Sequence, residues 1–144
     1  MFPITGRCLC GAVTVTVKGE PVRMAQCHCL DCQRNTGTGH SNNSIFREAD
    51  VEVSGGPTRG FAVTADSGNV LTRHFCETCG SRMFAYNSGR PGMITLPAGV
   101  FEDTSWYEPR MVLYQGRRKA WDPELPGVPA FDQMAPVPPP AGSN

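Results

Sequence analysis

The sequence lacks an excess of charge of either sign. Its 13 lysine and arginine residues balance 13 aspartate and glutamate residues, for a formal net charge of +0 at pH 7. No overall field therefore recruits nucleic acid or an acidic membrane surface. Aromatic residues make up only 8% of the chain and are scattered, which argues against a stacking platform for single-stranded nucleic acid. We expect neither nucleic acid nor a membrane as a partner.

Long apolar runs are also missing. The longest are far too short to span a bilayer, and residues 1–7 contain no apolar segment of the kind that a secretory signal carries. The glycines are not placed as in a nucleotide-binding loop, and no serine occupies a nucleophile elbow. An odd cysteine count of seven without such a signal argues against a disulfide framework. We therefore expect reduced, metal-binding thiols in a cytoplasmic protein.

The sequence is rich in grouped cysteines instead. The first group is a Cys-x-Cys, the second packs three thiols into six residues as Cys-His-Cys-Leu-Asp-Cys, and the third is a Cys-x-x-Cys. A structural zinc takes four protein ligands, whereas a catalytic zinc takes three and keeps one position open. Seven thiols in these groups therefore indicate one closed and one open zinc site.

The residues that follow the thiols show which groups belong together. Gly11 and Gly80 directly follow the first and third groups, whereas Gln33 follows the second. A chain that wraps a metal needs a residue tolerant of positive φ, and a small one lets backbone N–H groups approach the sulfurs. This pattern predicts a closed site of Cys8, Cys10, Cys76 and Cys79, and an open site of Cys27, Cys29 and Cys32.

Two interpretations of the three-thiol group stay open. Either the fourth position is left for water or substrate, or the chain fills it and the site is structural; the candidates for that ligand are His28, His40, His74 and Asp31. The middle side chain of a Cys-x-Cys strand points to the opposite face, which disfavours His28. We expect His40 and His74 to be strand residues with hydrogen-bond partners rather than ligands.

The charge of an open three-thiolate site indicates its chemistry. Three thiolates on a divalent zinc sum to −1, so the metal is a weak Lewis acid towards a carbonyl. Such a site is better suited to binding an incoming thiol and lowering its pKa. Arg34, two residues after Cys32, is our first candidate for a charge partner or anion-binding group, with a solvated surface arginine as the alternative.

Many short apolar stretches between glycine and proline turns predict an all-β architecture. We expect strands at 13–17, 22–26, 40–46, 51–53, 61–64, 69–75, 81–86, 93–98 and 110–114, and a helical turn at 33–37. The first two strands would place the first and second cysteine groups near opposite ends of a hairpin, or on neighbouring strands. Residues 1–131 form one predicted domain. A proline-rich tail, 132–144, would be extended or disordered, with Trp121, Leu125 and Phe131 as anchors before it.

Three stretches, residues 6–13, 27–37 and 75–81, resemble the glutathione-dependent formaldehyde-activating enzyme (GFA) family, which also includes centromere protein V. The closing Trp121…Leu125-Pro126…Phe131 is similar to the C-terminal pattern of that family, so the resemblance covers nearly the whole chain. It implies a mainly β fold of stacked antiparallel sheets organised around zinc-binding knuckles. That fold is related to a small zinc-bearing chaperone of Rab GTPases.

The resemblance also implies an activity and two zinc ions per chain. Cys8, Cys10, Cys76 and Cys79 would hold a structural zinc, and Cys27, Cys29 and Cys32 a labile, catalytic one. The reaction would be condensation of formaldehyde with glutathione to S-hydroxymethylglutathione, classed by its reverse as a carbon–sulfur lyase. As our own hypothesis beside the resemblance, the helical turn after Cys32, with Arg34, would receive a carboxylate of the tripeptide. The alternatives are a non-catalytic thiol-, zinc- or partner-binding module, or a related enzyme for another aldehyde or thiol adduct.

Overall fold

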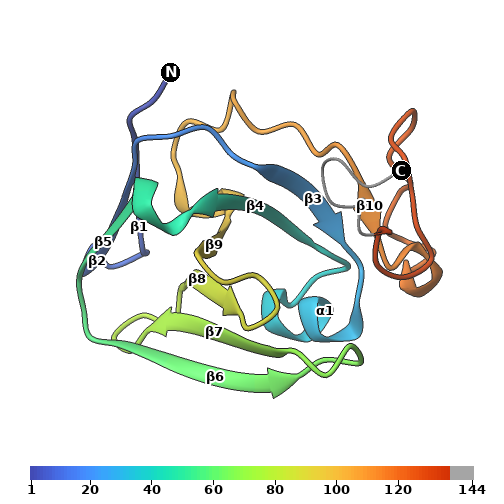
Figure 1. Cartoon of the computed structure of the whole chain (residues 1–144), viewed down its shortest axis with the longest axis horizontal. Helices are drawn as coiled ribbons and strands as arrows, with labels where there is room; N and C mark the ends of the chain where they lie inside the picture. Colours follow the sequence, from blue (N-terminus) through green and yellow to red (C-terminus); the bar gives the residue numbers. More distant parts are fainter. Residues whose placement is uncertain (137–144) are drawn as a thin grey trace, which may run out of the picture. The chain divides into compact units, whose positions relative to one another are not determined.

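The structure, a computed structural model, describes residues 1–136 (Figure 1). It consists of two compact units. The first contains Met1–Ala25 and Asn42–Glu108, and the second contains Gln26–Ser41 and the chain from Pro109 onward. Most of the predicted tail, residues 137–144, lies outside the described part. The regular structure is mainly antiparallel β-sheet, which confirms the predicted fold class.

One sheet of the first unit has three antiparallel strands, in the order β1 (Ile4–Arg7), β2 (Val13–Val17) and β5 (Val51–Gly55). Buried and exposed side chains alternate along β2 as predicted. Val13, Val15 and Val17 are fully buried, whereas the threonines between them face away from the core. A period of two places every valine on one face of the sheet, and that face packs inward.

A second sheet of the first unit is longer. Its antiparallel strands follow the order β4 (Ser41–Arg47), β9 (Met93–Pro97), β8 (Arg82–Asn87), β7 (Val70–Cys76) and β6 (Thr58–Thr64). Strands β6 and β7 form the predicted second hairpin, closed by a hydrogen bond from the Ala65 N–H to the Asn69 carbonyl. β7 delivers Cys76 at its last position, so this hairpin carries the third thiol group into place.

The predicted pairing of the first two strands is wrong. β2 lies between β1 and β5, and β3 (Arg23–Cys27) belongs to the other sheet. Strand β1, which the sequence analysis did not predict, takes one edge of β2, and β5 takes the other. With both edges of β2 hydrogen-bonded, β3 has no position beside it. The Val22 N–H donates to the Ile45 carbonyl instead.

Side chains from both sheets form the core of the first unit. The valines of β2 pack in one cluster with Phe46, Met83, Ile94 and Leu96 of the longer sheet, so the two sheets are stacked. The same cluster contains Cys8 and Cys76, which are 1% and 0% exposed. Cys8, which directly follows β1, and Cys76, which ends β7, are therefore part of the hydrophobic core.

The second unit has little regular structure. The last two residues of β3 pair in parallel with β10 (Val112–Leu113), which is shorter than the strand predicted at 110–114. The helix α1 (Leu30–Thr36) follows β3. The chain then returns along β10, because the Val112 N–H donates to the Pro129 carbonyl and the Tyr114 N–H to the Gln133 carbonyl.

The segment between β10 and this return departs from the sequence analysis at Trp121. Its side chain is 67% exposed, so it is not the predicted anchor, whereas Leu125 and Phe131 are partly buried. Its neighbour Asp122 is buried instead, at 7% exposed. Within residues 1–136, no helix is long and apolar enough to cross a membrane.

Short 3-10 helices complete the structure. η1 (Glu48–Asp50) joins β4 to β5, and η2 (Ala98–Val100) follows β9. The third, η3 (Gln115–Arg117), follows β10 in the second unit. Its last carbonyl, that of Arg117, accepts a hydrogen bond from the Gln33 side chain of α1.

Candidate metal centres

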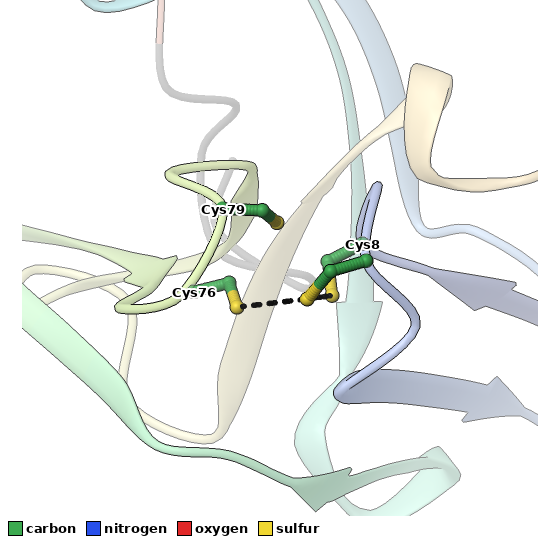
Figure 2. Close-up of side chains that lie close together, drawn as sticks. Cys8, Cys76 and Cys79 are labelled. Atoms are coloured by element: carbon green, nitrogen blue, oxygen red, sulfur yellow. Dashed lines mark hydrogen bonds between the residues drawn. The ribbon is translucent and has the colours of Figure 1, made fainter.

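Four sulfurs of the first unit converge on one point. The Sγ atoms of Cys8, Cys10, Cys76 and Cys79 all lie within 4.8 Å of one another, and Figure 2 shows three of these side chains pointing inward. Cys8 Sγ lies 3.6 Å from Cys10 Sγ, which lies 3.8 Å from Cys76 Sγ. A tetrahedron with Zn–S bonds of 2.3 Å has edges of about 3.8 Å, whereas a disulfide is about 2.05 Å long. The donor set and its spacing fit zinc, and none of the seven cysteines, all of which lie within residues 1–136, forms a disulfide.

The backbone around these thiols has the predicted form. Gly11 has a φ of 81° and Gly80 a φ of 77°, so both lie in the left-handed region that the sequence analysis expected. The Gly11 N–H donates to the Cys8 carbonyl, and the Gly80 N–H donates to the Cys76 carbonyl. Each thiol pair is therefore closed by one tight turn, which presents both of its sulfurs on the same side.

Ser81 connects the two turns, a role that the sequence analysis missed. Its hydroxyl lies 3.2 Å from Cys79 Sγ and accepts a hydrogen bond of 3.0 Å from the Leu9 N–H of the other turn. Hydrogen bonding from the Ser81 side chain, and then from its N–H, lowers the pKa of Cys79 to about 5. The thiolate form that a metal requires is thus favoured at this position. Only its place directly after Cys-Gly could have indicated Ser81.

The three thiols of the second unit form another cluster. The sulfurs of Cys27, Cys29 and Cys32 lie within 4.8 Å of one another. Cys27 ends β3, and Cys29 caps α1 by accepting a hydrogen bond of 3.2 Å from the Cys32 N–H. The helix therefore begins at Leu30, three residues before the predicted turn, because a thiol side chain satisfies an N–H of its first turn. It ends as predicted at Gly37, with a φ of 77°.

This second cluster favours a cation. Cys27 is buried, and its neighbours Cys29 and Cys32 raise the pKa of its thiol. Three thiols so close together cannot all ionise unless a positive charge offsets the repulsion between their thiolates. A divalent metal supplies that charge and draws the protons off. The donor set therefore fits zinc here too, with three ligands from the chain.

No fourth chain ligand completes this cluster within residues 1–136, where no further Cys, His, Asp or Glu joins the three thiols. Asp31 is exposed in the first turn of α1. His74 stacks on Phe84 with ring centroids 4.5 Å apart, and burial lowers its pKa. His28 and His40 belong to a separate cluster. His74 therefore lies in a strand as predicted, but its contacts are with aromatic rings, whereas His40 has the predicted hydrogen-bond partner and lies directly before β4 instead of inside it.

That separate cluster unites both histidines with Asp122. His40 Nδ1 lies 2.5 Å from Asp122 Oδ2, and His28 Nδ1 lies 3.4 Å from the same oxygen and 3.0 Å from the Gly39 carbonyl. Burial lowers the pKa of His28, so a neutral ring donates its Nδ1–H to that carbonyl. The sequence analysis missed Asp122, which is 82 positions from His40 and belongs to no short motif.

Arg34 lies on the exposed side of the last turn of α1. Within residues 1–136 no carboxylate forms an ion pair with it. Its role as an anion-binding group stays a prediction.

The structure is that of a mainly β protein with one cluster of four thiols and another of three, each of which could hold a metal ion. The particular family follows from comparison with known proteins. The model of the family described as "Glutathione-dependent formaldehyde-activating enzyme" matches residues 3–117, and the chain belongs to this family.

The chain is also similar to two individual proteins. It is 26% identical over 95 residues to a Halomonas elongata protein provisionally named a glutathione-dependent formaldehyde-activating enzyme, across 63% of this chain and 60% of that protein. The chain thus spans less than two thirds of that relative. A crystal structure of a Rhodobacter sphaeroides protein superposes with a TM-score of 0.58 at 21% identity, covering 89% of this chain and 100% of that one. This second likeness shows the shared fold.

Proposed function

We propose that this chain is a zinc-dependent enzyme that condenses formaldehyde with glutathione to an S-hydroxymethyl adduct, or cleaves that carbon–sulfur bond in reverse. The observation that carries the proposal is the three-thiol cluster, in which the described chain supplies no fourth ligand. Membership of the glutathione-dependent formaldehyde-activating enzyme family and the name of the Halomonas elongata relative support the substrate pair.

The reaction needs no oxidant or reductant. The sulfur of the thiol forms a bond to the carbonyl carbon, the π electrons of the C=O bond move to oxygen, and that oxygen gains a proton while the thiol loses one. Zinc held by Cys27, Cys29 and Cys32 would supply stabilisation of the thiolate form of the incoming sulfur. Because formaldehyde adds thiols spontaneously, proximity and a larger thiolate fraction are the contributions the enzyme has to make.

The remaining residues of the proposal would bind the substrate or stabilise the fold. Arg34 would receive a carboxylate of the tripeptide, for which its fork of N–H donors is suited. Cys8, Cys10, Cys76 and Cys79 would hold a structural zinc that takes no part in the reaction. We therefore propose two zinc ions per chain, one permanent and one labile. A reducing compartment such as the cytoplasm would keep all seven thiols available.

The test measures adduct formation with the zinc-loaded chain. Exchange of formaldehyde between free and thiol-bound forms can be followed by magnetisation-transfer NMR with glutathione, and Cys29→Ser provides the matched control without a complete three-thiol site. We expect a rate well above the uncatalysed one for the wild type, and the uncatalysed rate for Cys29→Ser. Equal rates for the two proteins would overturn the proposal.

The same samples distinguish the alternatives. Calorimetric binding of glutathione without acceleration would identify a thiol-binding module instead of an enzyme. Acceleration with a different thiol or aldehyde, and none with glutathione and formaldehyde, would assign a related carbon–sulfur reaction. A panel of small thiols and aldehydes therefore decides the substrate pair, which a relative of 26% identity does not establish for this chain.

A further inference from the structure

A buried carboxylate lies beside the three-thiol segment, beyond the part of the chain that the family model matches. That match ends at residue 117, and Asp122 follows it. Its side chain is 8% exposed and lies 2.5 Å from the Nδ1 atom of His40. Burying a carboxylate costs free energy unless the group is hydrogen-bonded or paired with a charge. The partners of Asp122 should therefore explain why it is buried here.

The first link from Asp122 to the thiols passes through His28, which stands between Cys27 and Cys29 in the sequence. The ring of His28 is held by the Gly39 carbonyl at 3.0 Å and faces Asp122 at 3.4 Å. Its carbonyl oxygen accepts a hydrogen bond of 2.8 Å from the Gln33 side chain. Hydrogen bonds therefore hold both the ring and the backbone carbonyl of His28. They also fix the backbone between Cys27 and Cys29, which carry two of the three sulfurs.

The second link passes through Thr36. Its hydroxyl oxygen lies 2.8 Å from the Cys32 carbonyl and 3.3 Å from the His40 carbonyl. One side chain thus holds the backbone of the third thiol residue next to the backbone of His40. The ring of His40 in turn packs edge-on against that of His28, with centroids 5.2 Å apart. The network therefore reaches all three thiol residues.

Two features hold Asp122 in its place. The Arg118 guanidinium donates to the backbone carbonyl of Asp122 and approaches Glu124 at 3.5 Å, which leaves the Asp122 carboxylate to the histidines. Gly39 provides the necessary space, because a Cβ atom there would overlap the Asp122 carboxylate. Since Gly39 has no positive φ, the close approach is the reason for a glycine at this position.

We propose that Asp122 is the positioning residue of the three-thiol site. By holding His40 directly and His28 beside it, Asp122 sets the geometry of the Cys27–Cys29 backbone and thereby the metal affinity of the cluster. The inference rests on the proposed metal site and is independent of the glutathione chemistry. A third metal on His28, His40 and Asp122 is the competing interpretation. We favour hydrogen bonding, because the Gly39 carbonyl and the Asp122 carboxylate already accept from the two rings.

The experiment compares metal affinities of the full chain. Asp122→Asn keeps the shape of the side chain and removes its charge, and Asp132→Asn is the matched control at an exposed carboxylate of the same unit. Chelator competition on the cobalt- or zinc-loaded protein measures each site, and thiolate-to-cobalt charge-transfer bands report the sulfur geometry. We expect Asp122→Asn to weaken the three-thiol site about 10- to 100-fold, and the control to stay within about twofold.

Gly39→Ala tests the same contact without altering a charged or metal-binding group. The added methyl group displaces the carboxylate, so we expect a loss of affinity at the three-thiol site similar to that of Asp122→Asn. The charge-transfer bands of the four-thiol site serve as an internal measure of folding. If Asp122→Asn does not fold, Gly39→Ala and His40→Gln decide the question by the same measurements.

Three outcomes would overturn the inference. One is unchanged affinity and unchanged bands in folded Asp122→Asn and Gly39→Ala. Another is a lower melting temperature with no change at the three-thiol site, which would make Asp122 merely structural. The third is a third bound metal in the wild type that Asp122→Asn alone removes. The metal-affinity measurements use no thiol or aldehyde substrate. A wild type that binds metal but does not accelerate the reaction would therefore refute the proposed function and leave this inference standing.

Discussion

The four-thiol and three-thiol clusters hold their sulfurs in different ways. The four-thiol cluster joins segments that are 66 positions apart, and two of its sulfurs belong to the hydrophobic core. The three-thiol cluster lies within six consecutive residues, where a helix cap and a polar network support it. A metal bound in the first arrangement would cross-link distant parts of the chain, and a metal bound in the second would join residues of one local turn.

This difference has an energetic consequence. Closing a long loop orders much more chain than closing a short one, so a metal in the four-thiol cluster contributes directly to folding. A metal in the three-thiol cluster bridges residues that are already neighbours. We therefore expect metal exchange at the three-thiol cluster to leave the fold intact, as the proposed labile site requires.

The largest expected effect comes from Cys76→Ser. This buried sulfur is both a proposed ligand of the four-thiol cluster and a core residue, so its loss would remove much of a metal-coupled folding energy of about 10–16 kcal/mol. We expect the variant to unfold or to lose its cooperative transition in urea. A transition like that of the wild type, measured by circular dichroism at equal zinc, would remove the distinction between the two clusters.

Cys29→Ser should affect the fold much less. We expect metal content to fall from two to one per chain, with a change in unfolding free energy of about 1 kcal/mol or less, because a serine oxygen can still cap α1. Metal analysis together with urea denaturation checks both numbers. A destabilisation as large as that of Cys76→Ser would show that both sites are structural.

Ser81→Ala tests the pH dependence of the closed cluster. A thiol whose pKa is lowered in the folded state contributes stability above its unfolded value, near 9, and that stability is lost as the pH falls towards about 5. Without the Ser81 hydroxyl, the pKa of Cys79 rises. We expect the variant to release metal from the closed cluster at a higher pH than the wild type.

An acid titration of both proteins, followed by release of zinc to a colorimetric chelator, gives the two midpoints. Only the closed cluster should respond, since Ser81 makes no hydrogen bond to the other thiols within residues 1–136. Equal midpoints would mean that Ser81 connects the two turns without tuning Cys79.

The smallest effect is expected for Arg34→Gln. An exposed guanidinium contributes little to binding, so we expect kcat/KM for glutathione to fall about two- to fivefold, with stability and metal content unchanged. Arg47→Gln, at another exposed arginine, is the control. Equal kinetics for the two variants would assign Arg34 to the solvated surface.

Local pattern sufficed for much of the fold. Alternating valines predicted β2, and the Ala65–Asn69 turn predicted the β6–β7 hairpin, because both depend on neighbours in the chain. The short strand β1 and the separation of β2 from β3 were missed. Strand partners are chosen by which buried faces fit together, and no local pattern encodes that choice.

The sequence by itself determined the thiol groups, their division into four and three, and the turns at Gly11 and Gly80, since spacing and backbone freedom are properties of a few adjacent residues. Only the tertiary structure decided that Ser81 would connect the two turns of one cluster and that Asp122 would reach the histidines beside the other. A hydrogen bond depends on where folding places two atoms, and distance along the chain does not predict it.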